Sequence, residues 1–262
     1  MFSASDILSS PTLVGLLFSV GAGIVRGFSG FGFSALTVAG VSLVMAPTEI
    51  IPAVLVLEVI ASLSVWRAAV HDLDMAWLKA LITGNLICIP MGAYLLAHLD
   101  PLHMRLLVGV ALLVTAATLR WRSAQALKAP PALKNATGAL SGFLNGLAAS
   151  GGVAAALMMA ATHVPAARLR GTIIVFLVFG SSYTLLWAAL FSMQAGASVA
   201  VFSMATLLWI PTLAPGMLLG MTLGRRAFQI ASPERFRLLV LDLLILISAL
   251  GSARAIQEVL AS

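Results

Sequence analysis

The chain has 262 residues, of which 61% are apolar and only 9% are charged. A soluble globular domain carries about 25% charged residues. Because a core of ordinary size could not hide this much apolar surface, the composition excludes a soluble protein. The mean hydropathy of +1.07 predicts a polytopic membrane protein that lies almost wholly in the bilayer. The net charge of +6 does not indicate nucleic acid, because Lys and Arg occur singly or in pairs beside apolar runs, as loop anchors do.

The sequence has no pattern typical of a cofactor or metal site. Cys88 is the only cysteine, so neither an intrachain disulfide nor a thiolate cluster is expected. No Gly-Lys dipeptide of a P-loop and no H-E-x-x-H zinc motif occurs. Residues 1–10 contain Asp6 but no Lys or Arg, which is not typical of a cleavable signal peptide. We therefore expect no cofactor, no metal and no step driven by ATP in this chain.

Long apolar runs occupy most of the chain. In order, they are 11–46, 50–66, 76–97, 101–119, 135–162, 171–191, 197–223 and 236–253. Most of them are about 20 residues long, which is enough for one helical crossing of the bilayer.

Two of these runs are too long for one helix and are interrupted by glycines. Gly27, Gly30 and Gly32 interrupt the first run, and Gly146, Gly151 and Gly152 interrupt the run 135–162. The pieces either side of the first break, 12–26 and 33–46, are each about 15 residues, too short for an upright span. Each long run is therefore predicted to be two short helices that meet at a glycine-rich break.

The two breaks are related by an internal duplication. Adding 119 to the numbers of Gly23, Gly27 and Gly32 gives Gly142, Gly146 and Gly151, and adding 132 maps Gly84, Gly92, Pro101 and Arg105 onto Gly216, Gly224, Pro233 and Arg237. We divide the chain into a first membrane repeat at 1–120, a linker at 121–134 and a second repeat at 135–262. The predicted fold is all-α, with two inverted repeats, each a glycine-broken helix or re-entrant hairpin plus three spanning helices, or about 8–10 membrane segments in total.

The distribution of positive charge favours broken runs that enter and return. This arrangement places on one side Arg67, Lys79, Arg120, Arg122, Lys128, Lys134, Arg168, Arg170, Arg225, Arg226, Arg235 and Arg237, and on the other Arg105 and Arg254. Arg26, which lies in the first break, is not counted. If each broken run crossed once, the charges would divide evenly. The positive-inside rule therefore predicts that both termini are periplasmic and that the linker 121–134 is cytoplasmic.

The two breaks also resemble the paired glycine-rich signatures of a known family. The segments Arg26–Ala35 (RGFSGFGFSA) and Asn145–Val153 (NGLAASGGV), with Arg168–Thr172 (RLRGT) after the second, are similar to those of the TauE/SafE sulfite exporter family. The resemblance covers essentially the whole chain. It implies secondary transport of sulfite, sulfoacetate or a related small sulfur-containing anion across the bacterial inner membrane.

The breaks are the first candidate for a substrate site. The second half-helices are expected to start near Gly32 and Gly152, and N–H groups at a helix N-terminus attract anions. The backbone and hydroxyl candidates are Gly27, Ser29, Gly30, Gly32, Ser150, Gly151 and Gly152. The alternative is that these glycines only allow close helix packing.

Three polar side chains beside the breaks could add donors. Arg26 offers forked N–H groups to an oxyanion, or it extends to the cytoplasmic surface. Asn145 is the matching residue of the second repeat and could donate an amide N–H. Arg170 could face a cavity or anchor a loop.

Two carboxylates interrupt apolar stretches, Glu58 in LVLEVI and Asp242 in LVLDLL. A carboxylate in the membrane is costly and usually faces the interior of a helix bundle. Each could carry protons for transport, or each could form a structural pair with an Arg or a hydroxyl.

The sequence thus predicts a secondary transporter of a small anion, sulfite or an organosulfonate, whose partners are the anion and the lipid bilayer. A passive small-anion channel is the alternative. The tetrapeptide Gly27-Phe-Ser29-Gly30 also matches the motif of an intramembrane serine protease, but His71, His98, His103 and His163 all fall at span ends or in loops. We therefore do not expect an enzyme.

Overall fold

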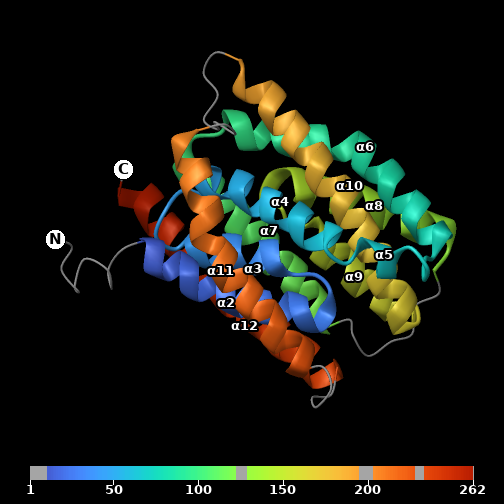
Figure 1. Cartoon of the computed structure of the whole chain (residues 1–262). Helices are drawn as coiled ribbons and strands as arrows, with labels where there is room; N and C mark the ends of the chain where they lie inside the picture. The colour runs from blue at the N-terminus through green and yellow to red at the C-terminus, as the bar shows by residue number, and fades with distance from the viewer. Residues whose placement is uncertain (1–10, 122–128, 195–202, 228–232, 262) are drawn as a thin grey trace.

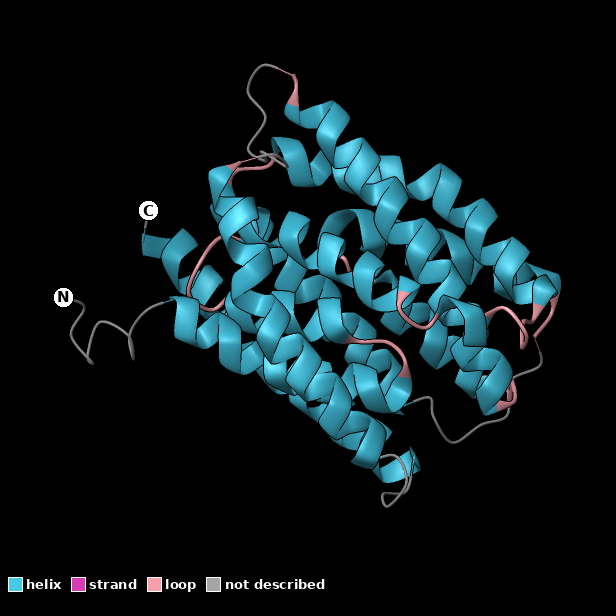
Figure 2. Ribbon diagram, viewed as in Figure 1, coloured by secondary structure: helices cyan, strands magenta, loops and turns pink. Residues whose placement is uncertain are grey.

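The computed structural model describes residues 11–121, 129–194, 203–227 and 233–261, and all regular structure in these ranges is helical (Figures 1 and 2). The helices are α2 (Pro11–Ser29), α3 (Phe33–Val41), α4 (Pro47–Leu63), α5 (Trp66–Ala69), α6 (Met75–His98), α7 (Pro101–Trp121), α8 (Pro131–Ala148), α9 (Gly151–Ala161), α10 (Ala166–Ser192), α11 (Met204–Ala227) and α12 (Pro233–Ala261). The predicted linker 121–134 lies partly outside the described residues.

Several of these helices are suited to a bilayer. Among the described residues, α2, α6, α10 and the segment Thr206–Ala227 are long and apolar enough to cross a membrane, and shorter apolar stretches lie at Leu102–Thr118 and Gly151–Ala161. The all-α polytopic membrane protein expected from the composition is confirmed.

The chain reverses direction at the first break. Gly30 and Gly32 have φ of +86° and +92°, which a residue with a Cβ rarely adopts, and they separate α2 from α3. Gly32 then lies beside Val25, and Gly40 lies beside Phe18. The two helices therefore form an antiparallel hairpin, and all nine residues of α3 are buried within the protein.

The prediction of two short helices at this break is wrong in its boundaries. Helix α2 has 19 residues and runs through Gly27 to Ser29, whereas α3 has only nine. Gly27 has no unusual backbone conformation, so the helix continues through it. The break comes three residues later, where Gly30 and Gly32 take positive φ.

The second break also reverses the chain, but not at a glycine. Helix α8 runs through Gly146 to Ala148, and Ala149 takes φ of 52°. Ser141 precedes the turn and Gly151 follows it, and Ser141 Oγ donates a hydrogen bond to Gly151 O at 2.7 Å. The chain therefore also returns along α8, and Gly146, like Gly27, is not part of the turn itself.

Glycines instead bring two pairs of helices into backbone contact. On α2 and α11 these are Gly23, Gly27, Gly216, Gly220 and Gly224, and on α6 and α8 they are Gly84, Gly92, Gly138, Gly142 and Gly146. A Cβ at any of them would overlap backbone atoms or the base of a side chain on the facing helix. Figure 1 shows α2 and α11 side by side along one face of the molecule. Close approach at small residues is the usual way in which helices associate in a bilayer.

Helices α7 and α12 form a third, antiparallel pair with an ion pair toward each end. Arg105 Nη1 lies 2.9 Å from Glu258 Oε2, and Arg120 Nε lies 2.8 Å from Asp242 Oδ1. Each of the three pairs joins a helix that ends at or before residue 121 to one that begins after residue 130. The two halves of the sequence therefore interlock.

The glycine contacts give a testable prediction for stability. Gly84→Ala should lower the thermal unfolding temperature in detergent, because its Cβ would overlap the backbone of Gly138, and overpacking of this kind costs about 1–3 kcal/mol. Gly21→Ala is the matched control on α2, since nothing lies within 4 Å of its Cβ. Equal unfolding temperatures for the two variants would contradict the close packing of α6 on α8.

Candidate functional site

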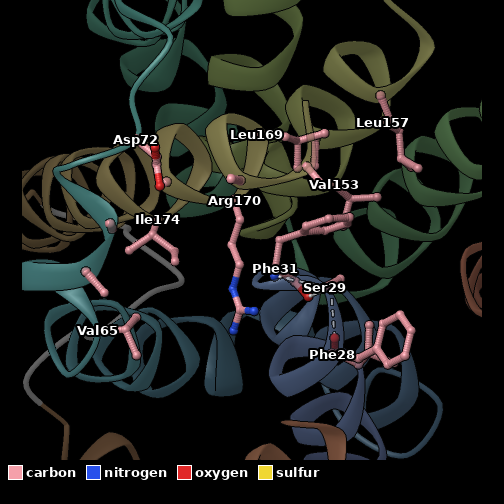
Figure 3. A pocket seen from close by; sticks show the side chains of 18 of the residues that line it. Phe28, Ser29, Phe31, Val65, Asp72, Val153, Leu157, Leu169, Arg170 and Ile174 are labelled. Carbon is pink, nitrogen blue, oxygen red and sulfur yellow. Dashed lines mark hydrogen bonds between the residues drawn. The ribbon is translucent and has the colours of Figure 1, made fainter. Parts of the chain in front are cut away.

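A partly open pocket of about 690 Å³ lies where the end of α2, α5, α9, the start of α10 and the end of α11 meet (Figure 3). Most of its lining is apolar, including Phe28, Phe31, Val153 and Leu157. Its charged lining residues are Asp72, Arg170 and Arg225. The pocket thus combines a mainly apolar wall with two guanidinium groups.

A narrow space adjoins this pocket and reaches Arg26. It measures about 10 Å³, enough for at most one water molecule. It is lined by Arg26, Gly27, Gly30, Val65, Arg170, Ile174, Met221 and Arg225, of which Val65, Arg170, Ile174 and Arg225 also line the pocket. We call this space the neck. Three arginines from three helices, α2, α10 and α11, therefore surround it.

The backbone of the first break makes room for Arg170. A Cβ on Gly30 would lie 2.9 Å from Arg170 Cγ and 3.4 Å from its Nε, so the side chain lies directly against the turn. Figure 3 shows Arg170 extending from α10 into the pocket, toward Ser29 and Phe31. Glycine is needed at position 30 for two reasons, its positive φ and this contact.

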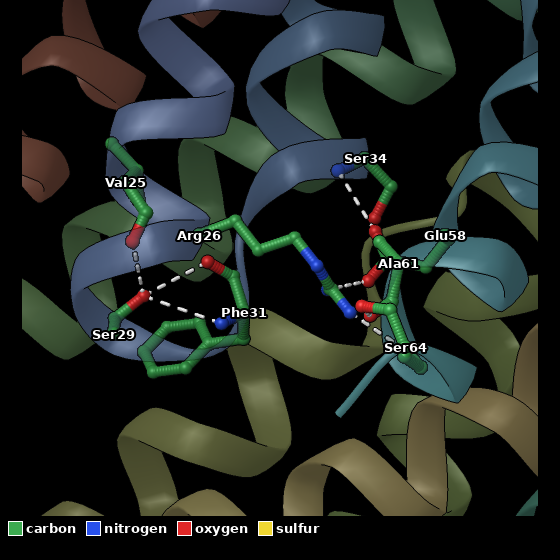
Figure 4. Close-up of polar contacts among 9 residues, drawn as sticks. Val25, Arg26, Ser29, Phe31, Ser34, Glu58, Ala61 and Ser64 are labelled. Carbon is green, nitrogen blue, oxygen red and sulfur yellow. Dashed lines mark hydrogen bonds and ion pairs between the residues drawn. The ribbon is translucent and has the colours of Figure 1, made fainter. Parts of the chain in front are cut away.

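Ser29 holds the turn in shape. Its Oγ lies 2.8 Å from Val25 O and 2.9 Å from Phe31 O, and it accepts from the Phe31 N–H at 3.3 Å (Figure 4). These described partners are backbone atoms and include no histidine. None of these described contacts is with a general base, which a serine nucleophile needs for its activation.

Arg26 and Glu58 form a buried ion pair (Figure 4). Their side chains are 2% and 1% exposed. Arg26 Nη1 donates to Glu58 Oε1, and Arg26 Nη2 donates to Ser62 Oγ at 2.6 Å. The other carboxylate oxygen, Oε2, accepts from the Ser34 N–H at 3.2 Å, in the first turn of α3. Arg26 therefore does not extend to the surface. The Glu58 carboxylate occupies the position at the N-terminus of α3 where the sequence predicts a bound anion.

The predicted residues of the second break lie away from the pocket. Asn145 Nδ2 donates to Thr184 Oγ1 at 3.1 Å, and Ser150 Oγ donates to Leu144 O at 3.3 Å. Gly151 packs on Ser141, and Gly152 packs on Leu177. From this hairpin, α9 contributes Val153, Ala156, Leu157 and Ala160 to the pocket wall instead.

The structure thus divides the predicted site residues into groups. Around the pocket and the neck it brings together Arg26, Gly27, Ser29, Gly30 and Arg170. Gly32 caps α3 close by. Asp242 lies at the outer surface, 57% exposed and paired with Arg120, so it is not a carboxylate of the bundle interior.

Two contributors were missed by sequence reasoning. Arg225 was counted as a loop anchor, and nothing in the sequence separates it from the neighbouring Arg226. It reaches the neck only because α11 packs against α2. Ser62 had a usable signal, since it stands four residues after Glu58 and so shares its helix face.

The buried pair generates a prediction for stability. Arg26→Met should reduce the free energy of unfolding by about 3–5 kcal/mol, because it leaves the Glu58 carboxylate buried without its partner. The double variant Arg26→Met, Glu58→Leu should regain most of this loss, since it removes both charges. Chemical unfolding in detergent at pH 8 measures both effects. A single variant as stable as the parent protein would show that the pair contributes little.

Comparison with known proteins gives the family. The family model described as sulfite exporter TauE/SafE matches residues 15–250, which include all of the pocket and neck residues. Searches of curated proteins and of solved structures gave no match. Because the match spans nearly the whole chain, the protein belongs to the TauE/SafE family of sulfite exporters, which are membrane transporters.

Proposed function

We propose that this protein is a secondary transporter that moves sulfite or an organosulfonate, such as sulfoacetate, across the bacterial inner membrane. The observation that carries the proposal is the meeting of Arg26, Arg170 and Arg225 around the neck, at the edge of a pocket large enough for a small organic anion. Guanidinium groups present forked donors to oxyanions. The largely apolar wall strengthens these contacts, because charges interact more strongly in surroundings of low polarity.

The narrow neck favours a transporter over a passive channel. An open channel needs a continuous path, whereas a space of about 10 Å³ does not admit a sulfonate group. A neck this narrow is consistent with alternating access, in which the protein rearranges around a bound anion. Saturation of the anion flux at high concentration would distinguish the transporter from the channel.

We further propose that the two halves are inverted repeats. Helix α2 packs on α11 just as α8 packs on α6, and each hairpin, α2–α3 and α8–α9, has the same form. In this proposal Asn145, Ser150, Gly151 and Gly152 serve the anion in the state that opens on the opposite side. Glu58 remains a candidate for proton coupling, whereas the exposed position of Asp242 favours a structural pair.

The arginine site gives a binding prediction. Loss of a charge-assisted hydrogen bond costs about 1.5–3 kcal/mol, so Arg170→Ala and Arg225→Ala should each weaken anion binding by roughly 10- to 150-fold. The matched controls Arg168→Ala and Arg226→Ala, both exposed and outside the pocket lining, should bind as the parent protein does. Calorimetry on purified protein with sulfite, sulfate, thiosulfate, sulfoacetate and taurine measures the effect. If no anion of this panel binds, or if the four variants behave alike, the proposed site is wrong.

The charge distribution gives a prediction for topology. The linker should be cytoplasmic and the end of α10 periplasmic. In a Cys88→Ala background, a membrane-impermeant maleimide should label Gln194→Cys in intact cells, and Ala132→Cys only after the membrane is permeabilised. Both positions are exposed in the structure. Labelling of both from the same side would contradict the proposed orientation.

A further inference from the structure

A carboxylate of the chain itself occupies the place in this structure that is best suited to an oxyanion. Glu58 accepts from the Arg26 guanidinium through one oxygen and from the Ser34 N–H through the other. A guanidinium and the N–H groups at the start of a helix are the donors that would bind a free sulfonate or sulfite oxygen. Among the carboxylates whose side-chain burial the structure describes, Glu58 is also the only buried one.

This place adjoins the proposed anion site. Arg26 lines the neck and also holds Glu58, so one guanidinium is within reach of both the pocket side and the carboxylate. Ser62 Oγ binds the second terminal nitrogen of Arg26 at 2.6 Å. This contact would hold the Arg26 guanidinium in position if its ion pair with Glu58 broke.

The charged groups that line the neck beside the Arg26–Glu58 pair are positive, and the carboxylate of Asp72 lines only the adjoining pocket. Arg170 on α10 and Arg225 on α11 line the neck together with Arg26 of α2. Helix α3 has no titratable side chain, and on α7 the charged Arg105 and Arg120 pair with α12 instead. If Glu58 bound a proton, Arg26 would lose its partner carboxylate and would lie beside two further cations. This concentration of positive charge favours binding of a free anion in place of the Glu58 carboxylate.

We propose that Glu58 is a tethered substitute for the transported anion, and that the anion takes its place on Arg26 when Glu58 binds a proton. The inference rests on the proposed function and adds the coupling ion. A proton from water in the pocket binds a Glu58 oxygen, the ion pair with Arg26 breaks, and an anion oxygen accepts the freed N–H. When the anion leaves, Glu58 releases the proton and the pair forms again. One proton thus binds with each anion, because two anions cannot share the same buried N–H groups.

The test is proton-linked binding of sulfoacetate, whose two anionic groups stay ionised between about pH 6 and pH 8. Calorimetry in two buffers of different ionisation enthalpy should show uptake of about one proton per anion bound, and the affinity should fall by about tenfold per pH unit as the pH rises. Glu58→Gln, which keeps the shape but cannot ionise, should bind without proton uptake and with a flat pH profile. Its affinity at pH 8 should exceed that of the parent protein. Glu49 is an exposed carboxylate in the first turn of the same helix. The variant Glu49→Gln is therefore the matched control and should retain the proton uptake.

Each other outcome has a distinct meaning. Binding without proton uptake in the parent protein, a measurement that needs no variant, would overturn the exchange while leaving the arginine site intact. A folded Glu58→Gln variant that no longer binds would also overturn it, since Glu58 would then position Arg26 rather than compete for it. Failure of sulfoacetate to bind either protein, together with failure of the rest of the panel, would overturn the proposed function itself.

Discussion

The close approach of helices at glycine is the constraint on which the rest of this structure depends. Lipid is as apolar as leucine, so helices in a bilayer gain little by hiding apolar side chains from it and associate largely through tight packing. Here the backbones of α2 and α11 touch at Gly23, Gly27 and Gly220, and those of α6 and α8 touch in the same way. Because α11 packs closely on α2, Arg225 of α11 lies at the neck beside Arg26 of α2. The arginine cluster is therefore a product of glycine packing as much as of the arginines themselves.

The glycine pattern predicts that the chain breaks at two places, and it leaves open whether each glycine forms a turn or a helix contact, for a physical reason. The breaks were found because glycines interrupt long apolar runs at positions related by 119 residues. A run of glycines does not show, however, which ones take positive φ and which ones meet another helix. Gly30 and Gly32 do the first, whereas Gly27 and Gly146 do the second. That difference depends on tertiary contacts, as does the choice of Arg225 over Arg226.

The charged pair illustrates the same limit in another form. Both Arg26 and Glu58 stood out in the sequence because ionisable residues are rare and costly in a membrane. Their pairing could not be deduced, since they are 32 residues apart on different helices. At the second break the matching residue, Asn145, donates to Thr184 Oγ1, so an amide and a hydroxyl meet there in place of two charged groups. The two breaks thus both reverse the chain but differ in polarity, which the glycine pattern alone does not indicate.

The interlocked helix pairs also bear on the order in which the protein can assemble. Helix α2 leaves the ribosome long before its partner α11, which begins only at Met204. Until then the glycine face of α2 has nothing to pack against, and the pairing of α7 with α12 comes later still. The contact of α6 with α8 joins elements much nearer in sequence and can form earlier. Non-local contacts of this kind slow folding, because the intervening chain must be ordered before they are made. The glycine face of α2 must therefore stay uncovered in the membrane until α11 has been made, and lipid or an insertion factor would have to shield its exposed backbone in that interval.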